Sequence, residues 1–212
     1  MSDRETLAQQ VYRDLKQRIL EGQLSSDEVL TERTLALESG ISRTPLRAAI
    51  SRLEKENVIS RLPNGALMVR PVTIEQLLEI VQVRRLLEGA AAEKAASLPF
   101  TEELARSRAR MREFVSGDNI EFDLFWIDDD AFHNALAHAA DMPLLATMLT
   151  EMRSIARRCT ITRTHDRFDQ QALEHIAIID AIEARDGAAA RAAVEVHFDS
   201  VRTRFLGWLT RN

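Results

Sequence analysis

The sequence predicts a mainly α-helical protein: an N-terminal winged helix-turn-helix followed by an antiparallel six-helix bundle. Two short helical segments and two β-like segments occupy residues 31–70, in the order that a winged helix requires. From residue 73 onward the apolar spacing is helical throughout, and no segment there predicts a strand. The chain has only 7 glycines in 212 residues, which favours long helices joined by short connections.

A helix-turn-helix is predicted between Thr31 and Glu56. Thr31 is a suitable N-cap for a first short helix, and a tight turn at Gly40 follows that helix. The second helix opens with Ser42 as its N-cap and has Pro45 in its first turn. We expect this second helix to enter the major groove of DNA, because its first-turn N–H groups favour phosphate oxygens.

The two faces of this second helix differ in composition. The face that we expect to pack on the core is apolar and comprises Leu46, Ala49, Ile50 and Leu53. The side turned away from it comprises Thr44, Arg47, Ala48 and Ser51. The small side chains on that side allow the backbone to approach DNA, and Arg47 supplies bidentate donors for phosphates and base edges.

A β-hairpin forms the predicted wing. Residues 58–61 and 66–70 are β-like, and residues 63–65 join them with an Asn-Gly pair that predicts a two-residue turn. Residues 39–61 carry five basic and two acidic residues, although the formal net charge of the whole chain is −5. This concentration of positive charge favours DNA binding over the alternative, a small helical domain whose arginines are only solvated.

The length fits two domains, which we expect at residues 1–71 and 72–212. Thr73 and Gln76 form a predicted capping box at the start of the second domain. The single Cys159 excludes a disulfide framework and fits a reducing compartment. Since no leader opens the chain and no apolar run approaches the roughly 20 residues of a membrane span, we expect a cytoplasmic protein.

Helix-breaking residues divide the second domain. We expect six helices of the length typical of an antiparallel bundle, over residues 73–97, 101–116, 119–140, 143–164, 168–185 and 187–210.

Polar side chains lie on the apolar faces of three of these helices. Asp129 falls within a phenylalanine-rich stripe, and His133 follows it four residues later on the same face. His175 and His197 are centred on the apolar faces of the last two helices. A buried carboxylate costs several kcal/mol unless it is paired, protonated or bound to a cation. One inward histidine is commonly a core residue, but these four side chains together predict a site for Zn²⁺, Ni²⁺ or Mn²⁺.

A further inward charge lies on the first bundle helix. Arg84 shares a stripe with apolar residues, and Glu88 follows it four residues later. The pair is either a simple intrahelical ion pair or, with similar weight, a site where Arg84 holds the carboxylate of a small acid. The other two histidines, His138 and His165, are not expected to face the bundle.

Two runs in the first domain are specific: residues 30–36 are LTERTLA and residues 42–53 are SRTPLRAAISRL. With these runs, residues 7–71 resemble the DNA-binding domain of the GntR family of bacterial transcription regulators. The resemblance implies that the contacts with DNA come from Arg33, Ser42, Arg43, Thr44, Arg47 and the wing residue Gly65.

The resemblance extends into the second domain. The matching runs are VRRLLE at 83–88, DDAFH at 129–133, EHIAIIDAI at 174–182 and VHF at 196–198. They are similar to the all-helical, FCD-like effector domain of the FadR-type branch, in its shorter VanR-like variant with six helices. In metal-binding members the ligands are an Asp, a His four residues later and two further His. The resemblance implies the same role here for Asp129, His133, His175 and His197.

These observations favour a ligand-responsive transcription regulator, a repressor that binds an inverted repeat of double-stranded DNA as a homodimer. Its effector is expected to be a small carboxylic or hydroxy acid that binds at the metal. The alternative is a metal-dependent hydrolase with an Asp/His3 centre. Against it, no inward Glu or Asp is expected beside the ligands as a general base, and an enzyme leaves the winged helix unexplained. A metal-free regulator for a larger acyl ligand is a third possibility, which the four ligand positions disfavour.

Overall fold

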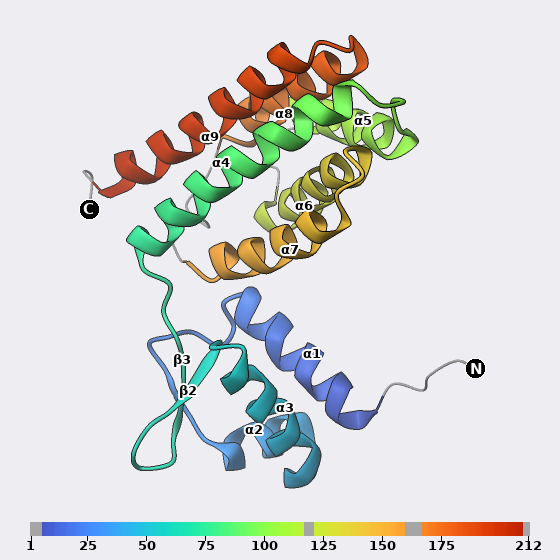
Figure 1. Cartoon of the computed structure of the whole chain (residues 1–212). Coiled ribbons are helices and arrows are strands. Elements are labelled where there is room, and N and C mark those ends of the chain that lie inside the picture. The colour runs from blue at the N-terminus through green and yellow to red at the C-terminus, as the bar shows by residue number, and fades with distance from the viewer. Residues whose placement is uncertain (1–5, 117–120, 160–166, 210–212) are drawn as a thin grey trace. The chain divides into compact units, whose positions relative to one another are not determined.

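The computed structural model describes residues 6–116, 121–159 and 167–209, and the chain divides into two units, 1–72 and 73–212. Both units are mainly helical, and the first also holds a small sheet, as the fold class predicts (Figure 1). Among the described helices, none combines the length and the apolar composition that crossing a membrane requires.

Three helices build the first unit: α1 (Leu7–Leu20), α2 (Glu32–Ser39) and α3 (Arg43–Lys55). Gly40 ends α2 with a φ of 64°, a left-handed conformation that glycine adopts without strain. The predicted core face of α3 is confirmed, because Leu46, Ala49, Ile50 and Leu53 are all buried. These side chains pack against α1 and fix the opposite face of α3 toward solvent.

The two N-caps of the helix-turn-helix differ from each other. Thr31 accepts a hydrogen bond from the backbone N–H of Thr34 at 3.1 Å, as expected of an N-cap. Ser42 has the extended backbone of an N-cap, but its side chain makes no capping hydrogen bond. Ser42 is therefore the N-cap residue of α3, as predicted, but its hydroxyl takes no part in capping and belongs to an exposed residue at the helix start.

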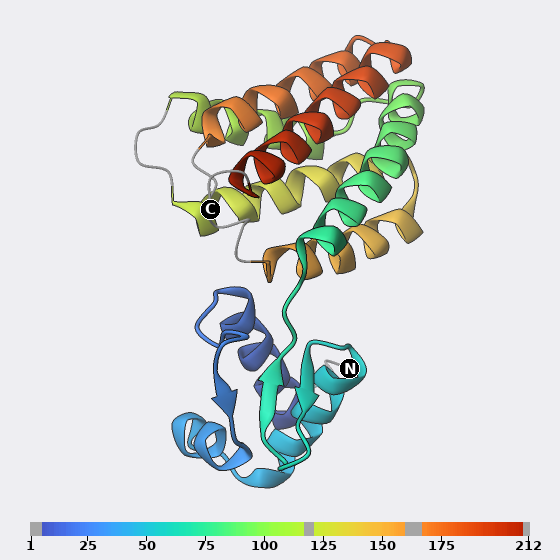
Figure 2. The same cartoon turned by 90° about the vertical axis from the view of Figure 1, so that its left-hand side faces the viewer.

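The sheet has one strand more than the sequence predicted. Strand β3 (Leu67–Val69) pairs antiparallel with β2 (Ile59–Arg61) on one side and with β1 (Val29–Leu30) on the other (Figure 2). In this register Val29 lies opposite Met68, and Ile59 lies opposite Val69. A strand of two residues is too short to show an alternating pattern, which is why β1 escaped prediction.

The wing turn also differs from the expected two-residue type. The backbone N–H of Leu62 bonds the carbonyl of Ala66, and the N–H of Gly65 bonds the carbonyl of Leu62. The loop therefore has three residues, with Gly65 at a φ of 82° as its left-handed member. The Asn64 side chain accepts from the N–H of Ala66 at 3.0 Å and so helps to close this loop.

The described part of the second unit contains six helices: α4 (Ile74–Ala96), α5 (Glu102–Ser116), α6 (Phe122–Ala139), α7 (Pro143–Arg157), α8 (Phe168–Glu183) and α9 (Gly187–Leu209). The capping box of Thr73 and Gln76 is present at the start of α4. The expected extension of α7 to residue 164 is wrong, since Arg158 and Cys159 are already outside the helix. Residues 160–164 of that expectation lie outside the described residues.

The helices pack so that polar residues of four of them meet inside the unit. Helix α4 lies along α9, α8 packs on both α5 and α9, and α6 packs on α4, α5 and α7 (Figure 1). Ion pairs of Arg85 with Asp199 and of Arg191 with Glu93 show that α4 and α9 run antiparallel. The inward faces of α6, α8 and α9 bring the candidate metal ligands together, and the inward face of α4 brings Glu88 beside them.

Candidate functional site

Three buried histidines lie together at the centre of the second unit. His133 from α6, His175 from α8 and His197 from α9 each offer one ring nitrogen, and these nitrogens lie within 4.8 Å of one another. None of the three residues is more than 1% exposed. Burial lowers the pKa of His133 to about 4 and the pKa of His175 well below its ordinary value, so both rings are neutral near pH 7.

The Nδ1 atom of each histidine has a partner on its outer side. Glu88 bonds Nδ1 of His133, Glu174 bonds Nδ1 of His197 at 2.8 Å, and the sulfur of Met111 lies 3.4 Å from Nδ1 of His175. A carboxylate that accepts the Nδ1 hydrogen fixes the tautomer in which Nε2 has the free lone pair. The three Nε2 atoms therefore are the ones available to a common ligand.

Asp129 lies at the edge of this histidine cluster. Its Oδ1 is 3.4 Å from Nε2 of His175 and 3.7 Å from Nε2 of His133. The guanidinium of Arg153 bonds the other carboxylate oxygen, and Gln171 donates to Oδ1 at 2.8 Å. Burial by itself raises the pKa of Asp129, but the charge of Arg153, together with those of other neighbours such as Arg84, outweighs burial and holds this pKa well below the usual range. Asp129 is therefore ionised.

The residues present fit a divalent metal ion. Two atoms that each lie about 2.1 Å from one tetrahedral Zn²⁺ are roughly 3.4 Å apart, close to the separation of Asp129 and His175. Within the described residues, the buried Nε2 of His175 has no hydrogen-bond partner, which is a cost unless another group uses its lone pair. Three imidazoles and one carboxylate are a donor set suited to Zn²⁺, Ni²⁺ or Mn²⁺.

The sequence reasoning named Glu88 only as the partner of Arg84 and missed Arg153 and Glu174, which also support this cluster. Arg153, Glu88 and Glu174 are all buried or nearly so, and each contacts a candidate ligand directly. The expectation that no further inward Glu lies beside the ligands is therefore wrong. Helical spacing offered a signal, because Arg153 follows the buried Leu149 by four residues and Glu174 precedes the buried Ile178 by four.

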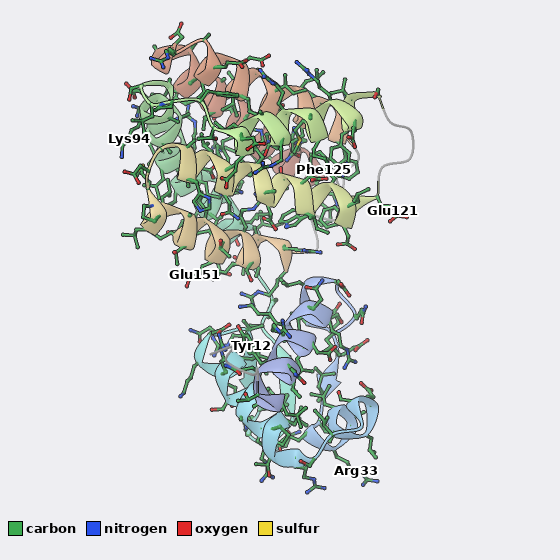
Figure 3. All side chains as sticks on the ribbon, turned by 90° about the vertical axis from the view of Figure 1, so that its right-hand side faces the viewer. Tyr12, Arg33, Lys94, Glu121, Phe125 and Glu151 are labelled. Atoms are coloured by element: carbon green, nitrogen blue, oxygen red, sulfur yellow. The ribbon has the colours of Figure 1, made fainter. Side chains whose placement is uncertain are left out.

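A cavity of about 60 Å³ opens beside the cluster. Its wall includes His133, His197 and Asp129 together with several aromatic side chains, among them Phe125, which Figure 3 labels within this unit. Arg84 also lines it and bonds Glu88 through Nε at 2.8 Å, so the intrahelical ion pair is present. The buried Nη2 of Arg84 has no partner among the described residues, which leaves a donor available to an anion.

The candidate DNA contacts lie on exposed surface of the first unit. Arg33, Ser42, Arg43, Thr44 and Gly65 are exposed, and Figure 3 shows Arg33 projecting from its edge. For Arg33 and Arg43 no ion pair occurs with any described residue. Arg47 is 63% exposed in its side chain.

Glu32 binds two cations on this surface. It accepts from Nε of Arg47 at 2.8 Å and pairs with Nη1 of Arg61 in β2 at 3.1 Å. Because exposed ion pairs contribute little free energy, either guanidinium can exchange Glu32 for a phosphate. In the absence of DNA, Glu32 therefore pairs with one arginine of α3 and one of the wing.

Of the two remaining histidines, His138 is 54% exposed in its side chain and lies 3.4 Å from Glu103. His165 lies outside the described residues.

Each half of the chain matches the model of a known protein family. Residues 7–69 match the family model described as bacterial regulatory proteins, gntR family, and residues 79–200 match the FCD domain. The chain belongs to the GntR family. The histidine cluster of this GntR regulator lies within its FCD domain, and α3 lies within its gntR domain.

Curated relatives of this GntR regulator are transcription regulators. The gluconate operon transcriptional repressor of Bacillus subtilis is 25% identical over 90% of this chain and 82% of its own length. The repressor RspR of Escherichia coli is 24% identical over 91% of this chain and 86% of its own length. The metal-dependent hydrolase considered above is therefore contradicted: the protein is a regulator and not an enzyme.

Solved structures show the same fold. McbR/YncC of Escherichia coli has a TM-score of 0.73 and 22% identity, over 99% of this chain and 100% of the other. A GntR regulator from Rhodococcus has a TM-score of 0.73 and 20% identity, over 94% and 97% of the two chains.

Proposed function

We propose that this GntR regulator is a repressor whose FCD domain binds one divalent metal ion and senses a small carboxylic or hydroxy acid. The observation that supports the metal is the convergence of three buried histidines, two of them with Nδ1 bound by a carboxylate. The names of the relatives, among them a gluconate operon repressor, support repression as the mode of action.

We assign DNA binding to residues 1–71. The contacts in this assignment are Arg33, Ser42, Arg43, Thr44, Arg47 and Gly65. The exposure of the first turn of α3 supports it, because N–H groups there and the guanidinium of Arg43 can reach phosphates and base edges. The αL backbone at Gly65 supports close approach of the wing tip to DNA.

Acid binding is assigned to the cavity beside the histidines. Asp129, His133, His175 and His197 would hold the metal, which when bound supplies open coordination positions for carboxylate oxygens. Arg84 would donate from Nη2 to the same acid. Glu88 orients both partners, because one of its oxygens bonds Arg84 and the other bonds His133.

Residues 72–212 are also assigned the dimer contact. A single winged helix contacts only one half-site, so two copies related by a two-fold axis would read an inverted repeat of double-stranded DNA. An acid changes DNA affinity only if it binds two arrangements of this dimer with different free energies.

The test is a DNA mobility-shift assay on the regulator's own operator, with zinc-loaded and chelator-treated protein. A panel of small acids is screened beforehand by thermal shift, because a ligand of the folded state raises the midpoint. We expect one class of acid to release DNA from the zinc-loaded protein only. Equal release from the chelator-treated protein would contradict the metal's part in sensing.

A further inference from the structure

Arg204 is, after Arg84, a second arginine of the cavity wall with a buried nitrogen that lacks a hydrogen-bond partner among the described residues. It lies on α9, lines the same cavity as Arg84 and is 20% exposed in its side chain. Its contacts are long: Nη1 is 3.5 Å from Glu174, and Nη2 is 3.4 Å from Gln171. Nη1 is buried and makes no hydrogen bond with any described residue. Burial lowers the pKa of this guanidinium, so its neighbours compensate its charge only in part.

Arg204 lies within the length of a small molecule from the metal cluster. Glu174 contacts Arg204 with one oxygen and Nδ1 of His197 with the other. Gln171 in the same way accepts from Arg204 and donates to Asp129. Arg204 is thus linked to His197 through Glu174 and to Asp129 through Gln171, with a single side chain between them in each case. An acid bound at the metal can therefore reach Arg204 with its other end.

The buried charges of this region balance only without the metal. Among the described residues, three arginines line the cavity, Arg84, Arg153 and Arg204, and the carboxylates of Glu88, Asp129 and Glu174 contact them. The carboxylate of Asp130, which also bonds Arg153, is 37% exposed and so is screened by water. A divalent ion would add two positive charges to this buried set. Because uncompensated buried charge is costly, a ligand with two negative charges fits this surplus better than one with a single charge.

We propose that the effector is a dianionic acid of the dicarboxylate class, whose second acidic group binds Arg204. This inference rests on the proposed function, in which the first acidic group binds at the metal and Arg84. Nη1 of Arg204 makes no hydrogen bond with any described residue, so the guanidinium can donate from this nitrogen to a carboxylate oxygen. Arg204 then determines which acids are effectors, and the metal determines that an acid binds at all.

The test compares diacids with their half-esters, which keep the shape and lose one charge. Succinate, glutarate and adipate are titrated calorimetrically into the zinc-loaded full-length protein beside their monomethyl esters. In the unaltered protein we expect one diacid to bind at least about tenfold more tightly than its half-ester. In Arg204→Met this advantage falls to about twofold or less. Arg202→Met, an exposed arginine on the same helix, keeps the full advantage.

Two outcomes would overturn the inference. Equal affinity of diacid and half-ester in the unaltered protein would exclude a second anion site. If the diacid keeps its advantage over the half-ester in Arg204→Met, another group binds the second carboxylate, for example the metal itself. If Arg204→Met loses zinc, Arg204 also supports Glu174. The affinities of diacid and half-ester for the unaltered protein then decide whether a second anion site exists. Binding of no acid of either kind would instead overturn the proposed function itself.

Discussion

The carboxylate of Glu88 accepts the Nδ1 hydrogen of His133, although the two residues lie on different helices. The other oxygen of Glu88 accepts from Arg84 at 2.8 Å. One buried side chain therefore fixes both the tautomer of a candidate metal ligand and the orientation of the candidate acid-binding arginine. Changes at Glu88 should affect the metal and the acid together.

Replacing Glu88 tests this support. In Glu88→Gln the amide no longer stabilises the Nδ1–H tautomer of His133 with a negative charge, so we expect zinc affinity to fall by about 10- to 100-fold. Competition with a chromophoric chelator measures the change. Glu79→Gln, an exposed residue on the same helix, is the control and should keep full affinity. Equal zinc affinity in both variants would refute the orienting role.

Metal content tests the ligand assignment. We expect about one divalent ion per chain by elemental analysis of the purified protein. His175→Ala and His197→Ala should each lose most of it, because each removes a ligand from a separate helix. His138→Ala is the control, since His138 is exposed and outside the cluster. Full metal content in His175→Ala would remove this residue from the site.

The DNA-binding assignment predicts a loss of specific affinity. Arg43→Ala and Arg47→Ala should each weaken operator binding by roughly 1–3 kcal/mol if the side chain contacts a base edge. Mobility shifts measure the effect, and Lys55→Ala at the other end of α3 is the control. If both arginine variants bind as well as the unaltered protein, α3 is not the recognition helix.

The two N-caps predict different stabilities. Thr31→Ala removes a capping hydrogen bond of 3.1 Å and should lower the free energy of unfolding of the first domain by about 1 kcal/mol. Ser42→Ala removes no such bond and should change it by less than about 0.5 kcal/mol. Chemical denaturation monitored by circular dichroism distinguishes the two. An equal loss in both variants would contradict the difference between the caps.

The proposed inverted-repeat operator requires two copies of the chain. We expect a homodimer of about 48 kDa, twice the chain mass of 24.0 kDa. Light scattering at micromolar protein, with and without zinc, measures the mass. A monomer under both conditions would contradict the assignment of a dimer contact to residues 72–212.

Helix positions were predictable because they follow from apolar spacing and capping residues. The buried face of α3 and the capping box at Thr73 both appear as predicted. Strand β1 was not predicted, because it depends on pairing with a segment distant in sequence. The three-residue wing loop was not predicted, because the Asn-Gly pair indicates a turn without fixing which residues close it. The prediction placed the start of α6 at residue 119 and the end of α7 at residue 164, next to helix-breaking residues. Both limits differ from those of the described helices, because tertiary context decides where a helix begins and ends.

The inward direction of the three clustered histidines was predictable from each helix alone. Their partners were not, because Glu88, Glu174 and Arg153 interact with residues on other helices. Spacing indicates that a charged residue lies on an inward face, but not which opposite charge it meets there. Arg204 illustrates the point, since its unpaired donor is visible only when its neighbours are placed.

The bridge of Glu32 to Arg47 and Arg61 has a consequence for the ionic strength at which the regulator works. Two guanidinium groups that already have a carboxylate partner attract fewer solution anions than free ones. When these guanidinium groups contact phosphates, the nearby carboxylate of Glu32 offsets part of their positive charge. They then release fewer condensed cations from the DNA, and the free energy of binding gains less from that release. Operator binding should therefore depend less steeply on salt than a count of exposed arginines suggests, and sequence-independent attraction to DNA is correspondingly weaker.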